Sequence, residues 1–387
     1  MKIAYVTVAS LPSSTAHASY AANLCDALGR NGCDILLLGA KGPLDEAQHR
    51  LDFPHLTLHT IGWRGLTRHS YLKLILMAGM LLFRGARWQS ERLFVTHNEV
   101  LAAAFVLQGR KFIFDMHDFG PSGRILKYIL RSANCLGCFF SASTVQHAFE
   151  SRIAPVGKPK LVLGNAIDPK YLKPRGDRMA LRSALSIAAD RTVIAHIGSM
   201  GKDRGIDLML QAAASGKFPN LFWLFVGGRP DEVTAWRRQA AAAGLRDDTV
   251  RFVGFQRQET LGDWYEISDV LCAPYRRTLR GWDYVASMKL LEYQAVGKYA
   301  VVAAMPYALE VLSPQNTAFF EPGEPGAFDR ALAEALRAVK MKSYRPAMFL
   351  ENTWDAKAKT LMAWAQTIQD ESMEARAASY ANTPHER

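Results

Sequence analysis

A lysine and a glutamate stand three residues apart in SMKLLEYQAVGK, residues 287–298, a stretch that is otherwise mostly apolar. Ser287 is a residue type that caps the start of a helix, and Gly297 is a type that ends one. Lys289 would lie in the first turn, where a cation is unfavourable unless an anion binds there. Glu292 follows on the same face, where its carboxylate can accept hydrogen bonds from both hydroxyls of a ribose-like diol. The spacing predicts a sugar-nucleotide site; the alternative is an exposed Lys–Glu pair on an amphipathic helix.

A second basic stretch, GSMGKDRGID at residues 198–207, follows an apolar run and precedes a helical pattern. Its backbone amides, from Gly198 and Ser199 onward, can approach a diphosphate closely. It contains neither G-K-[ST] nor G-x-G-x-x-G, so it is neither a P-loop nor a dinucleotide fingerprint. Arg204, with Lys202 as a further candidate, is placed to act with Lys289 in neutralising a bound anion. The alternative is a solvated basic turn.

Two further groups of polar residues follow predicted strands. His117 and Asp118 end the run 111–118, at the carboxyl end of a strand, where α/β proteins bind ligands. This place makes His117 a candidate ligand contact, although a histidine beside an aspartate is more often a structural pair. His97 occupies a similar place after another strand. The loop after the first strand offers hydroxyls suited to a sugar or phosphate, from Ser13, Ser14 and Thr15.

These residues are placed by an alternation of strands and helices along most of the chain. The predicted strands are continuous apolar runs, which is typical of a parallel sheet covered on both faces. They lie at 3–9, 34–39, 92–97, 111–118, 138–143, 159–168, 192–199, 221–228, 249–255, 268–275 and 299–304. We therefore expect an α/β protein with two Rossmann-like parallel-sheet domains facing across a cleft.

A polar, basic and proline-containing segment after Asp168 indicates the boundary between the two domains. The expected divisions are an N-terminal acceptor-binding domain at 1–168 and a C-terminal nucleotide-sugar-binding domain at 169–345. Residues 346–387 would form a C-terminal helix, around Thr353–Ile368, that crosses back to the first domain, followed by a polar tail.

Composition limits the classes of partner. The chain has 387 residues and a net charge of +11, which suggests an anionic partner. No run of about 18 apolar residues is present, so we predict no transmembrane helix, and the first apolar run is too short for a secretory signal. The five cysteines include a lone C-x-x-C, Cys135 and Cys138, without a second pair for zinc. We expect buried thiols in a reducing cytoplasm.

The segment 64–92 combines six Lys or Arg residues with a single acid, Glu91, and contains the apolar run Tyr71–Phe83. That run is too short to span a bilayer but suits its interface. We hypothesise that it seats the protein on an anionic inner leaflet, where a lipid-linked acceptor would be found. The alternative is a buried helix beside the N-terminal sheet.

An ordered set of short stretches resembles the retaining glycosyltransferase family 4 of the GT-B fold, of the bacterial glycan or exopolysaccharide type. The stretches are ALGRNGCDILLL, FDMHD, GNAID, AHIGSMGKDRGIDLML, VRFVGF, SDVLCAPY and SMKLLEYQAVGKYAVVAA. The resemblance implies that Glu292 is the ribose-binding member of a glutamate pair, Arg204 a phosphate ligand and His117 the sugar-facing histidine. The chain departs from the family's pattern at Tyr284, in place of the first glutamate, and at Ser199, in place of an arginine.

The resemblance also implies the reaction. A hexose-type sugar would pass from a UDP- or GDP-sugar to a lipid-linked or growing glycan acceptor in surface polysaccharide biosynthesis, with no cofactor or metal. The expected catalytic residues are His117, Asp118, Arg204 and Lys289. The expected donor-binding residues are Gly198, Ser199, Lys202, Arg204, Phe255, Tyr284, Ser287, Met288, Lys289, Leu290 and Glu292. The expected acceptor-side residues are Ser13, Ser14, Thr15 and His97.

The expected partners are the donor, a glycan or polyprenyl-diphosphate-linked acceptor and an anionic membrane surface, with the protein peripheral on the cytoplasmic face of a bacterial inner membrane. Two alternatives stay open within the fold: a non-catalytic sugar-nucleotide-binding subunit, suggested by Tyr284 and Ser199, and a GT-B nucleotide-sugar epimerase. Nucleic-acid binding is not expected, because only the net charge favours it and no aromatic-basic motif is present.

Overall fold

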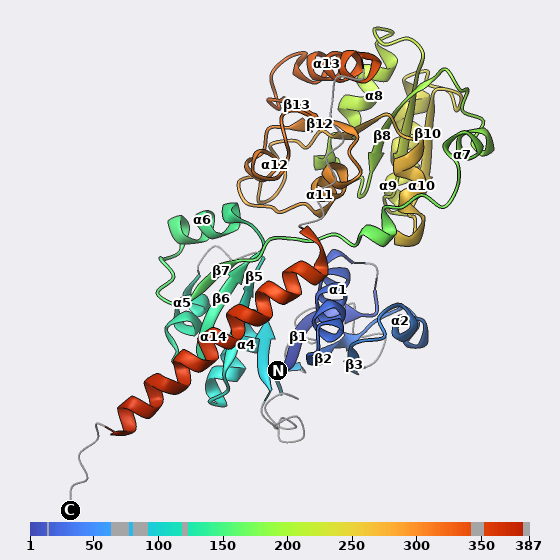
Figure 1. Ribbon diagram of the computed structural model, residues 1–387. Coiled ribbons are helices and arrows are strands. Elements are labelled where there is room, and N and C mark those ends of the chain that lie inside the picture. The colour runs from blue at the N-terminus through green and yellow to red at the C-terminus, as the bar shows by residue number, and fades with distance from the viewer. Residues whose placement is uncertain (14, 63–76, 80–91, 118–122, 342–351, 382–387) are drawn as a thin grey trace, which may run out of the picture. The chain divides into compact units, whose positions relative to one another are not determined.

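The computed structural model describes residues 1–13, 15–62, 77–79, 92–117, 123–341 and 352–381 (Figure 1). The chain divides into two compact units. Unit 1 comprises Met1–Gly164 and Trp354–Arg387, and unit 2 comprises Asn165–Thr353. Each unit contains one parallel sheet with helices packed against it, which confirms the predicted α/β fold class.

Unit 1 has a seven-stranded parallel sheet in the order β3-β2-β1-β4-β5-β6-β7. Its strands are β1 Lys2–Leu11, β2 Asp34–Lys41, β3 Thr57–Ile61, β4 Leu93–Thr96, β5 Phe112–Met116, β6 Cys135–Phe140 and β7 Lys160–Val162. Its helices are α1 Ala16–Arg30, α2 Glu46–Asp52, α4 Glu99–Leu107, α5 Arg124–Arg131, α6 Ser143–Arg152 and α14 Trp354–Ala381. The strand order reverses between β1 and β4, so a ligand-binding crevice is expected at the carboxyl ends of these two strands.

Two strands of this sheet differ from the sequence-based expectation. β3 alternates between exposed and partly buried residues, so it lacks the continuous apolar run by which the other strands were predicted. β7 covers only Lys160–Val162 of the predicted run 159–168. The chain leaves the sheet there because the amides of Leu163 and Gly164 both donate to the carbonyl of Phe140, with Gly164 at a φ of +74°.

The long helix α14 lies along unit 1, beside α1, although 325 residues separate their contacting side chains (Figure 1). Arg30 donates to Asp355 at 3.0 Å, and the rings of Tyr20 and Trp354 meet edge to face with centroids 5.3 Å apart. The predicted helix 353–368 thus begins one residue later and continues to Ala381. The C-terminal part of the chain is therefore an integral layer of the N-terminal unit.

Unit 2 has a six-stranded parallel sheet in the order β10-β9-β8-β11-β12-β13. Its strands are β8 Thr192–Ile197, β9 Leu221–Val226, β10 Val250–Gly254, β11 Val270–Ala273, β12 Tyr299–Ala303 and β13 Thr317–Phe320. Its helices are α7 Arg178–Ala184, α8 Ile206–Ala214, α9 Pro230–Ala242, α10 Leu261–Ile267, α11 Met288–Ala295, α12 Pro306–Val311 and α13 Ala327–Met341, with 3₁₀ turns η3 Pro169–Tyr171, η4 Lys202–Arg204 and η5 Gln258–Thr260. Here the order reverses between β8 and β11.

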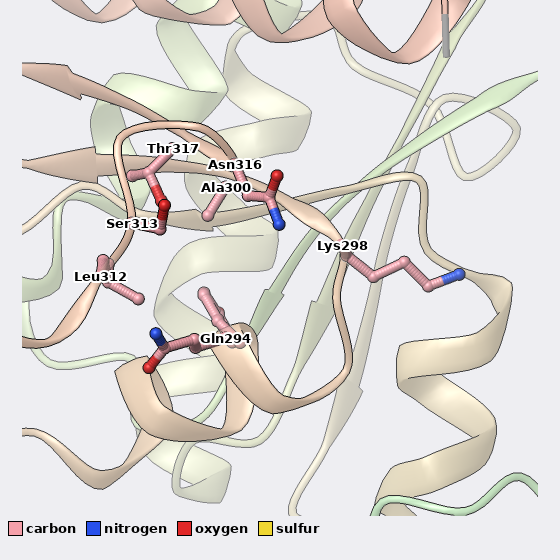
Figure 2. A pocket seen from close by; sticks show the side chains of 8 residues that line it. Gln294, Lys298, Ala300, Leu312, Ser313, Asn316 and Thr317 are labelled. Carbon is pink, nitrogen blue, oxygen red and sulfur yellow. The ribbon is translucent and has the colours of Figure 1, made fainter. Parts of the chain in front are cut away.

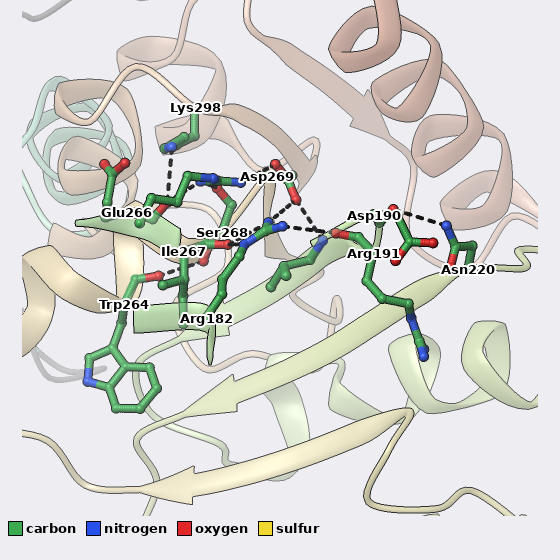
Figure 3. Close-up of polar contacts among 12 residues, drawn as sticks. Arg182, Asp190, Arg191, Asn220, Trp264, Glu266, Ile267, Ser268, Asp269 and Lys298 are labelled. Carbon is green, nitrogen blue, oxygen red and sulfur yellow. Dashed lines mark hydrogen bonds and ion pairs between the residues drawn. The ribbon is translucent and has the colours of Figure 1, made fainter. Parts of the chain in front are cut away.

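A buried ion pair joins α7 to the amino ends of β8 and β11 (Figure 3). Arg182 is only 4% exposed and donates to Asp269 at 2.5 Å and to the carbonyl of Ile267 at 2.9 Å. Asp269 also accepts from the amide of Val193 at 2.8 Å. Burying this guanidinium is tolerable because its donors are matched by acceptors, so the network fixes the edge of the sheet opposite the carboxyl ends.

All five cysteines are buried and free, which confirms the expectation of buried thiols. Cys135 and Cys138 both belong to β6, and burial raises the pKa of Cys135 to about 12. These thiols are therefore protonated and poorly reactive.

The basic apolar segment predicted to meet a membrane, 64–92, lies almost entirely outside the described residues. Arg92, at its end, forms an ion pair of 2.8 Å with Asp34. Within the described ranges, the helices include none that is both long and apolar enough to cross a membrane.

Candidate functional site

The carboxyl ends of β8, β9 and β10 are held together by glycine-containing loops. The amide of Gly198 donates to the carbonyl of Val226 at 2.8 Å, and that of Gly227 donates to Gly254 at 2.7 Å. Gly198 has a φ of +135°, and a Cβ on it would lie 2.7 Å from Nζ of Lys289. Residue 198 must therefore be a glycine for the Lys289 ammonium to lie over the end of β8.

The turn that leads into α8 is fixed on two sides. Gly205 has a φ of +72°, and an added Cβ would lie 1.7 Å from the carbonyl oxygen of Pro274, so the chain passes the loop after β11 without space for a side chain. On the other side, the indole Nε1 of Trp236 in α9 donates to the carbonyl of Met200 at 2.7 Å. Both contacts hold η4, with Arg204, beside the end of β8.

The start of α11 differs in one respect from the prediction. Ser287 is the N-cap residue, but its hydroxyl makes no capping bond; it shares a hydrogen bond of 2.7 Å with the hydroxyl of Tyr275 instead. The side-chain amide of Asn165 donates from Nδ2 to the carbonyl of Ala286 at 3.0 Å and so supports the turn before the helix. The serine thus ties α11 to the loop after β11, because Tyr275 competes successfully for its oxygen.

Lys289 and Arg204 meet at the ring of Tyr275. Nζ of Lys289 lies 5.6 Å from the ring centre and Cζ of Arg204 lies 5.4 Å from it, distances at which a cation is attracted to the π face. Nε of Arg204 also donates to the hydroxyl of Ser199 at 3.0 Å. Ser199, the departure from the family's arginine, therefore orients the arginine that comes five residues later.

The ammonium of Lys289 is unusually easy to deprotonate. Burial, followed by the charge of Arg204, lowers its pKa to about 7, while Glu292 acts in the opposite direction. A bound anion would oppose both effects by stabilising the charged form. Arg204 also lies 3.4 Å from Asp203, yet the two cations remain next to each other, which is an arrangement suited to a site that receives a diphosphate.

Glu292 lies one turn after Lys289 in α11, and its Oε2 accepts a hydrogen bond of 2.7 Å from the hydroxyl of Tyr265. Burial raises the pKa of Glu292, whereas the Tyr265 bond and the charge of Lys289 lower it. A carboxylate has about four acceptor positions, so the tyrosine fixes its orientation and leaves capacity for a diol.

The other predicted donor-binding residues of unit 2 occupy varied environments. The Leu290 side chain is fully buried and its amide donates to Ser287, so it belongs to the core. Phe255 is 62% exposed directly after β10, and Lys202 is exposed in η4. Tyr284 is folded against Gly281, and Met288 is partly buried at the first position of α11.

Unit 1 carries its own polar cluster at the carboxyl end of β5. Nε2 of His117 lies 2.9 Å from Oδ1 of Asp115, outside the geometry of a hydrogen bond, and the hydroxyl of Tyr5 donates to Oδ2 of Asp115 at 2.7 Å. The rings of Tyr20 and His117 meet edge to face with centroids 4.2 Å apart. The acidic neighbour of His117 is therefore Asp115, near the end of β5; Asp118 lies outside the described residues.

Two more histidines join this cluster. The rings of His17 and His97 stack with centroids 5.5 Å apart, and His97 lies 6.3 Å from the ring of His117. Burial and the neighbouring histidines lower the pKa of His97 to about 3, so it is neutral at physiological pH. In the adjoining loop, the hydroxyls of Ser13 and Thr15 are 3.0 Å apart and Thr15 caps α1, while Ser14 lies outside the described residues.

Sequence reasoning missed several residues that shape these two sites. Asp115 and His196 had a signal, since each is a polar residue within an apolar strand and needs a partner when buried. Tyr265 and Tyr275 had none, because a tyrosine in a helix or after a strand is usually a core residue. His17 lies on a helix and approaches His97 only through the fold.

Within the described residues, no group of three or more His, Cys, Asp or Glu side chains could hold a metal ion. A pocket in unit 2 is lined by Tyr293, Gln294, Lys298, Ala300, Leu312, Ser313, Asn316 and Thr317 (Figure 2). Since Ala300 is the second residue of β12 and Thr317 is the first of β13, it lies at the amino edge of the sheet, opposite Gly198 and the other candidate residues.

The two parallel sheets, each with a reversed strand order, define the GT-B class of fold. A sucrose-phosphate synthase from Thermosynechococcus elongatus superimposes with a TM-score of 0.69 at 17% identity, covering 98% of this chain and all of that one. HepE of Anabaena, in complex with UDP, has a TM-score of 0.65 at 18% identity, with 98% and 100% coverage. At these identities the likeness shows the fold alone.

Sequence comparison supports a family for the C-terminal unit. Residues 177–345 match the family described as glycosyl transferases group 1. The D-inositol 3-phosphate glycosyltransferases of Kribbella flavida and Mycobacteroides abscessus are each 30% identical, over 46% and 38% of this chain and over 42% and 32% of their own lengths. The chain thus spans less than half the length of these curated relatives. The glycosyl transferase group 1 family is supported on this segment.

Proposed function

We propose that the protein is a retaining GT-B glycosyltransferase that moves a hexose-type sugar from a UDP- or GDP-sugar to a glycan or lipid-linked acceptor. The observation that carries this proposal is the grouping of Lys289 and Arg204 on Tyr275, with Glu292 one turn away, at the carboxyl end of β8. Such a group offers two cations to a diphosphate and a carboxylate to a ribose. The relatives named glycosyltransferases and the UDP complex of HepE support the same class of donor.

In the proposed reaction the bond between the anomeric carbon and the diphosphate oxygen breaks as the acceptor oxygen bonds to the same face of the sugar. The acceptor proton passes to the departing diphosphate oxygen, so no strong protein base is needed. Lys289 and Arg204 stabilise the charge that develops on the diphosphate, which is the task a metal ion performs in other transferases.

We assign the unit 1 cluster to the acceptor side. His117, set against Asp115, would orient an acceptor hydroxyl or the donor sugar, and His97 would present a neutral imidazole as a hydrogen-bond partner. The hydroxyls of Ser13 and Thr15 extend this surface. The same proposal assigns Asp118 and Ser14 to these sites.

The pathway and location belong to this proposal as well. The net charge of +11 and the basic segment 64–92 favour an anionic membrane surface and a polyprenyl-diphosphate-linked acceptor in surface polysaccharide biosynthesis. Co-sedimentation with vesicles of increasing phosphatidylglycerol content tests this part. Binding that does not depend on anionic lipid, or that survives reversal of Arg84 and Arg87, would contradict it.

The donor site is tested by calorimetry with UDP, GDP and their sugars in EDTA, using Lys289→Met and Arg204→Met. Each substitution should weaken binding of the preferred nucleotide at least tenfold. Lys340→Ala, which removes an exposed cation from α13 of the same unit, is the matched control and should bind as the wild type does. Absence of nucleotide binding by the wild type would refute the proposal.

A second candidate, a non-catalytic sugar-nucleotide-binding subunit, is favoured by Tyr284 and Ser199, the two departures from the family's pattern. Tight donor binding without sugar release to water or to membrane lipid extracts would support it. Conversion of the donor to its epimer, detected by chromatography of the nucleotide sugars, would instead show the epimerase.

A further inference from the structure

His196 is a fully buried histidine of β8 that contacts Lys289 of the candidate donor site. Its Nδ1 lies 3.0 Å from the carbonyl oxygen of Cys272 in β11. Its Nε2 lies 3.0 Å from the carbonyl oxygen of Ser199 and 3.1 Å from Nζ of Lys289. The imidazole thus connects two neighbouring strands, the loop that follows β8 and the ammonium of α11.

The partners determine which ring nitrogen carries the hydrogen. A neutral imidazole has one N–H, and Cys272 and Ser199 both offer acceptors. If Nε2 held the hydrogen, an N–H donor would face the ammonium of Lys289. If Nδ1 holds it, the imidazole donates to Cys272 and Nε2 accepts from Lys289. Burial, and next the charge of Lys289, hold the pKa of His196 well below its usual value, which disfavours the doubly protonated ring.

We propose that His196 is a positioning residue of the donor site, a neutral imidazole that accepts a hydrogen bond from Lys289 and so fixes the ammonium where the diphosphate binds. This inference rests on the proposed function, since it concerns the same anion site. His196 does not touch the substrate; it acts through Lys289. With the hydrogen on Nδ1, Nε2 makes no hydrogen bond to the carbonyl of Ser199; that residue is linked to the site through its hydroxyl, which receives the hydrogen bond from Arg204.

The need for such an acceptor follows from the surroundings of Lys289. The groups that face it are the ring of Tyr275, the guanidinium of Arg204, the carboxylate of Glu292 on its own helix, and His196. Burial and the charge of Arg204 both disfavour the charged form of Lys289, and within the described residues no carboxylate forms an ion pair with it. A hydrogen-bond acceptor at Nε2 of His196 therefore helps the Lys289 ammonium to stay charged and fixes its position for the ligand.

Two isosteres separate the functions of the two ring nitrogens. In His196→Gln the amide end reaches the position of Nε2, where it can accept from Lys289 and donate to Ser199. In His196→Asn the shorter amide reaches only the position of Nδ1 and keeps the bond to Cys272. We expect His196→Asn to weaken nucleotide binding about tenfold at pH 7.5 and to move the alkaline loss of binding about one pH unit lower. His196→Gln should remain near the wild type.

A readout without ligand isolates the effect on the lysine. The pH dependence of acetylation of Lys289 by acetic anhydride, followed by mass spectrometry, reports the protonation of its amine. The midpoint should fall in His196→Asn and be restored in His196→Gln. Thermal unfolding of both variants measures how much stability each substitution costs. A purely structural role of His196 would change only this stability. The proposed role also predicts different acetylation midpoints of Lys289 in the two variants.

The wild-type protein supplies a test that needs no variant. Long-range ¹H–¹⁵N spectra of histidine-labelled protein distinguish a protonated Nδ1 from a protonated Nε2, and a hydrogen on Nε2 at neutral pH would overturn the inference. So would equal acetylation midpoints in the wild type and His196→Asn. If the wild type binds no nucleotide but the midpoints differ as expected, the proposed function fails and the His196–Lys289 hydrogen bond stands.

Discussion

The assignment of Glu292 to a ribose can be tested by changing the carboxylate and the diol together. In Glu292→Ala, a nucleoside diphosphate loses two hydrogen bonds to a charged acceptor, each worth about 1.5 kcal/mol at the lower end of the usual range. The expected total of about 3 kcal/mol corresponds to a loss of affinity of about 100-fold. The orientation imposed by Tyr265 at 2.7 Å makes Tyr265→Phe a graded companion, with an expected loss of about fivefold.

The assay is calorimetry with the preferred nucleotide, UDP or GDP, and with its 2′,3′-dideoxy analogue. The wild type should bind the analogue about 100-fold more weakly than the parent, and Glu292→Ala should bind both alike. Since burial raises the pKa of Glu292, the preference for the diol should decline on acidification at a higher pH than an ordinary glutamate would give, and this decline should be absent in Glu292→Ala. An equal loss of affinity for parent and analogue in Glu292→Ala would refute the assignment.

Four further outcomes are expected. In the free protein, burial lowers the pKa of Lys289 to about 7, below its value in an unfolded chain, so the free energy of unfolding should rise with pH from about 7 to 10.5. Lys289→Met should lack this rise and should be more stable than the wild type at pH 7, by on the order of 1–2 kcal/mol after allowance for partial exposure. Urea unfolding without ligand measures both effects. Gly198→Ala should weaken nucleotide binding at least tenfold because its Cβ would displace Lys289, whereas Gly157→Ala, with nothing within 4 Å, should not. Asp269→Ala should cost about 3–5 kcal/mol in urea unfolding because Arg182 stays buried without its carboxylate, yet leave the nucleotide dissociation constant unchanged; a change in that constant would contradict the separation of the two edges of the sheet. Asp115→Asn should reduce sugar transfer at least tenfold in a radiolabelled-donor assay while nucleotide binding stays as in the wild type, and parallel losses in both would show a defect of folding instead.

Continuous apolar strands made the fold predictable, because in a doubly covered parallel sheet burial is recorded directly in the sequence. The edge strand β3 and the short β7 were not predicted as they stand, since their pairing depends on neighbouring strands more than on their own residues. For the same reason, the long course of α14 beside α1 could only be suggested.

The candidate site was predictable where a residue type conflicts with its local context. Lys289 in the first turn of a helix was such a conflict, and it led to the donor site. Its neighbours His196, Tyr265 and Tyr275 come from other elements, so their contacts arise only from the tertiary fold. The Ser287 hydroxyl illustrates the limit: its capping role is the local preference, and a tyrosine twelve residues away in sequence overrides it.

Because α14 belongs to the first unit, the polypeptide passes from one unit to the other twice, at 164/165 and again at 353/354. The two passages are neighbours, for the amide of Ile167 donates to the carbonyl of Asn352 at 2.8 Å. A single proteolytic cut at 164/165 would leave unit 2 covalently joined to α14 alone, so residues 1–164 would stay attached only through the packing of α14 on α1. A cut at 353/354 would instead leave residues 1–353 continuous and detach α14. Shortening the chain to its first 353 residues would remove α14 and so expose the side chains of α1 that pack against it.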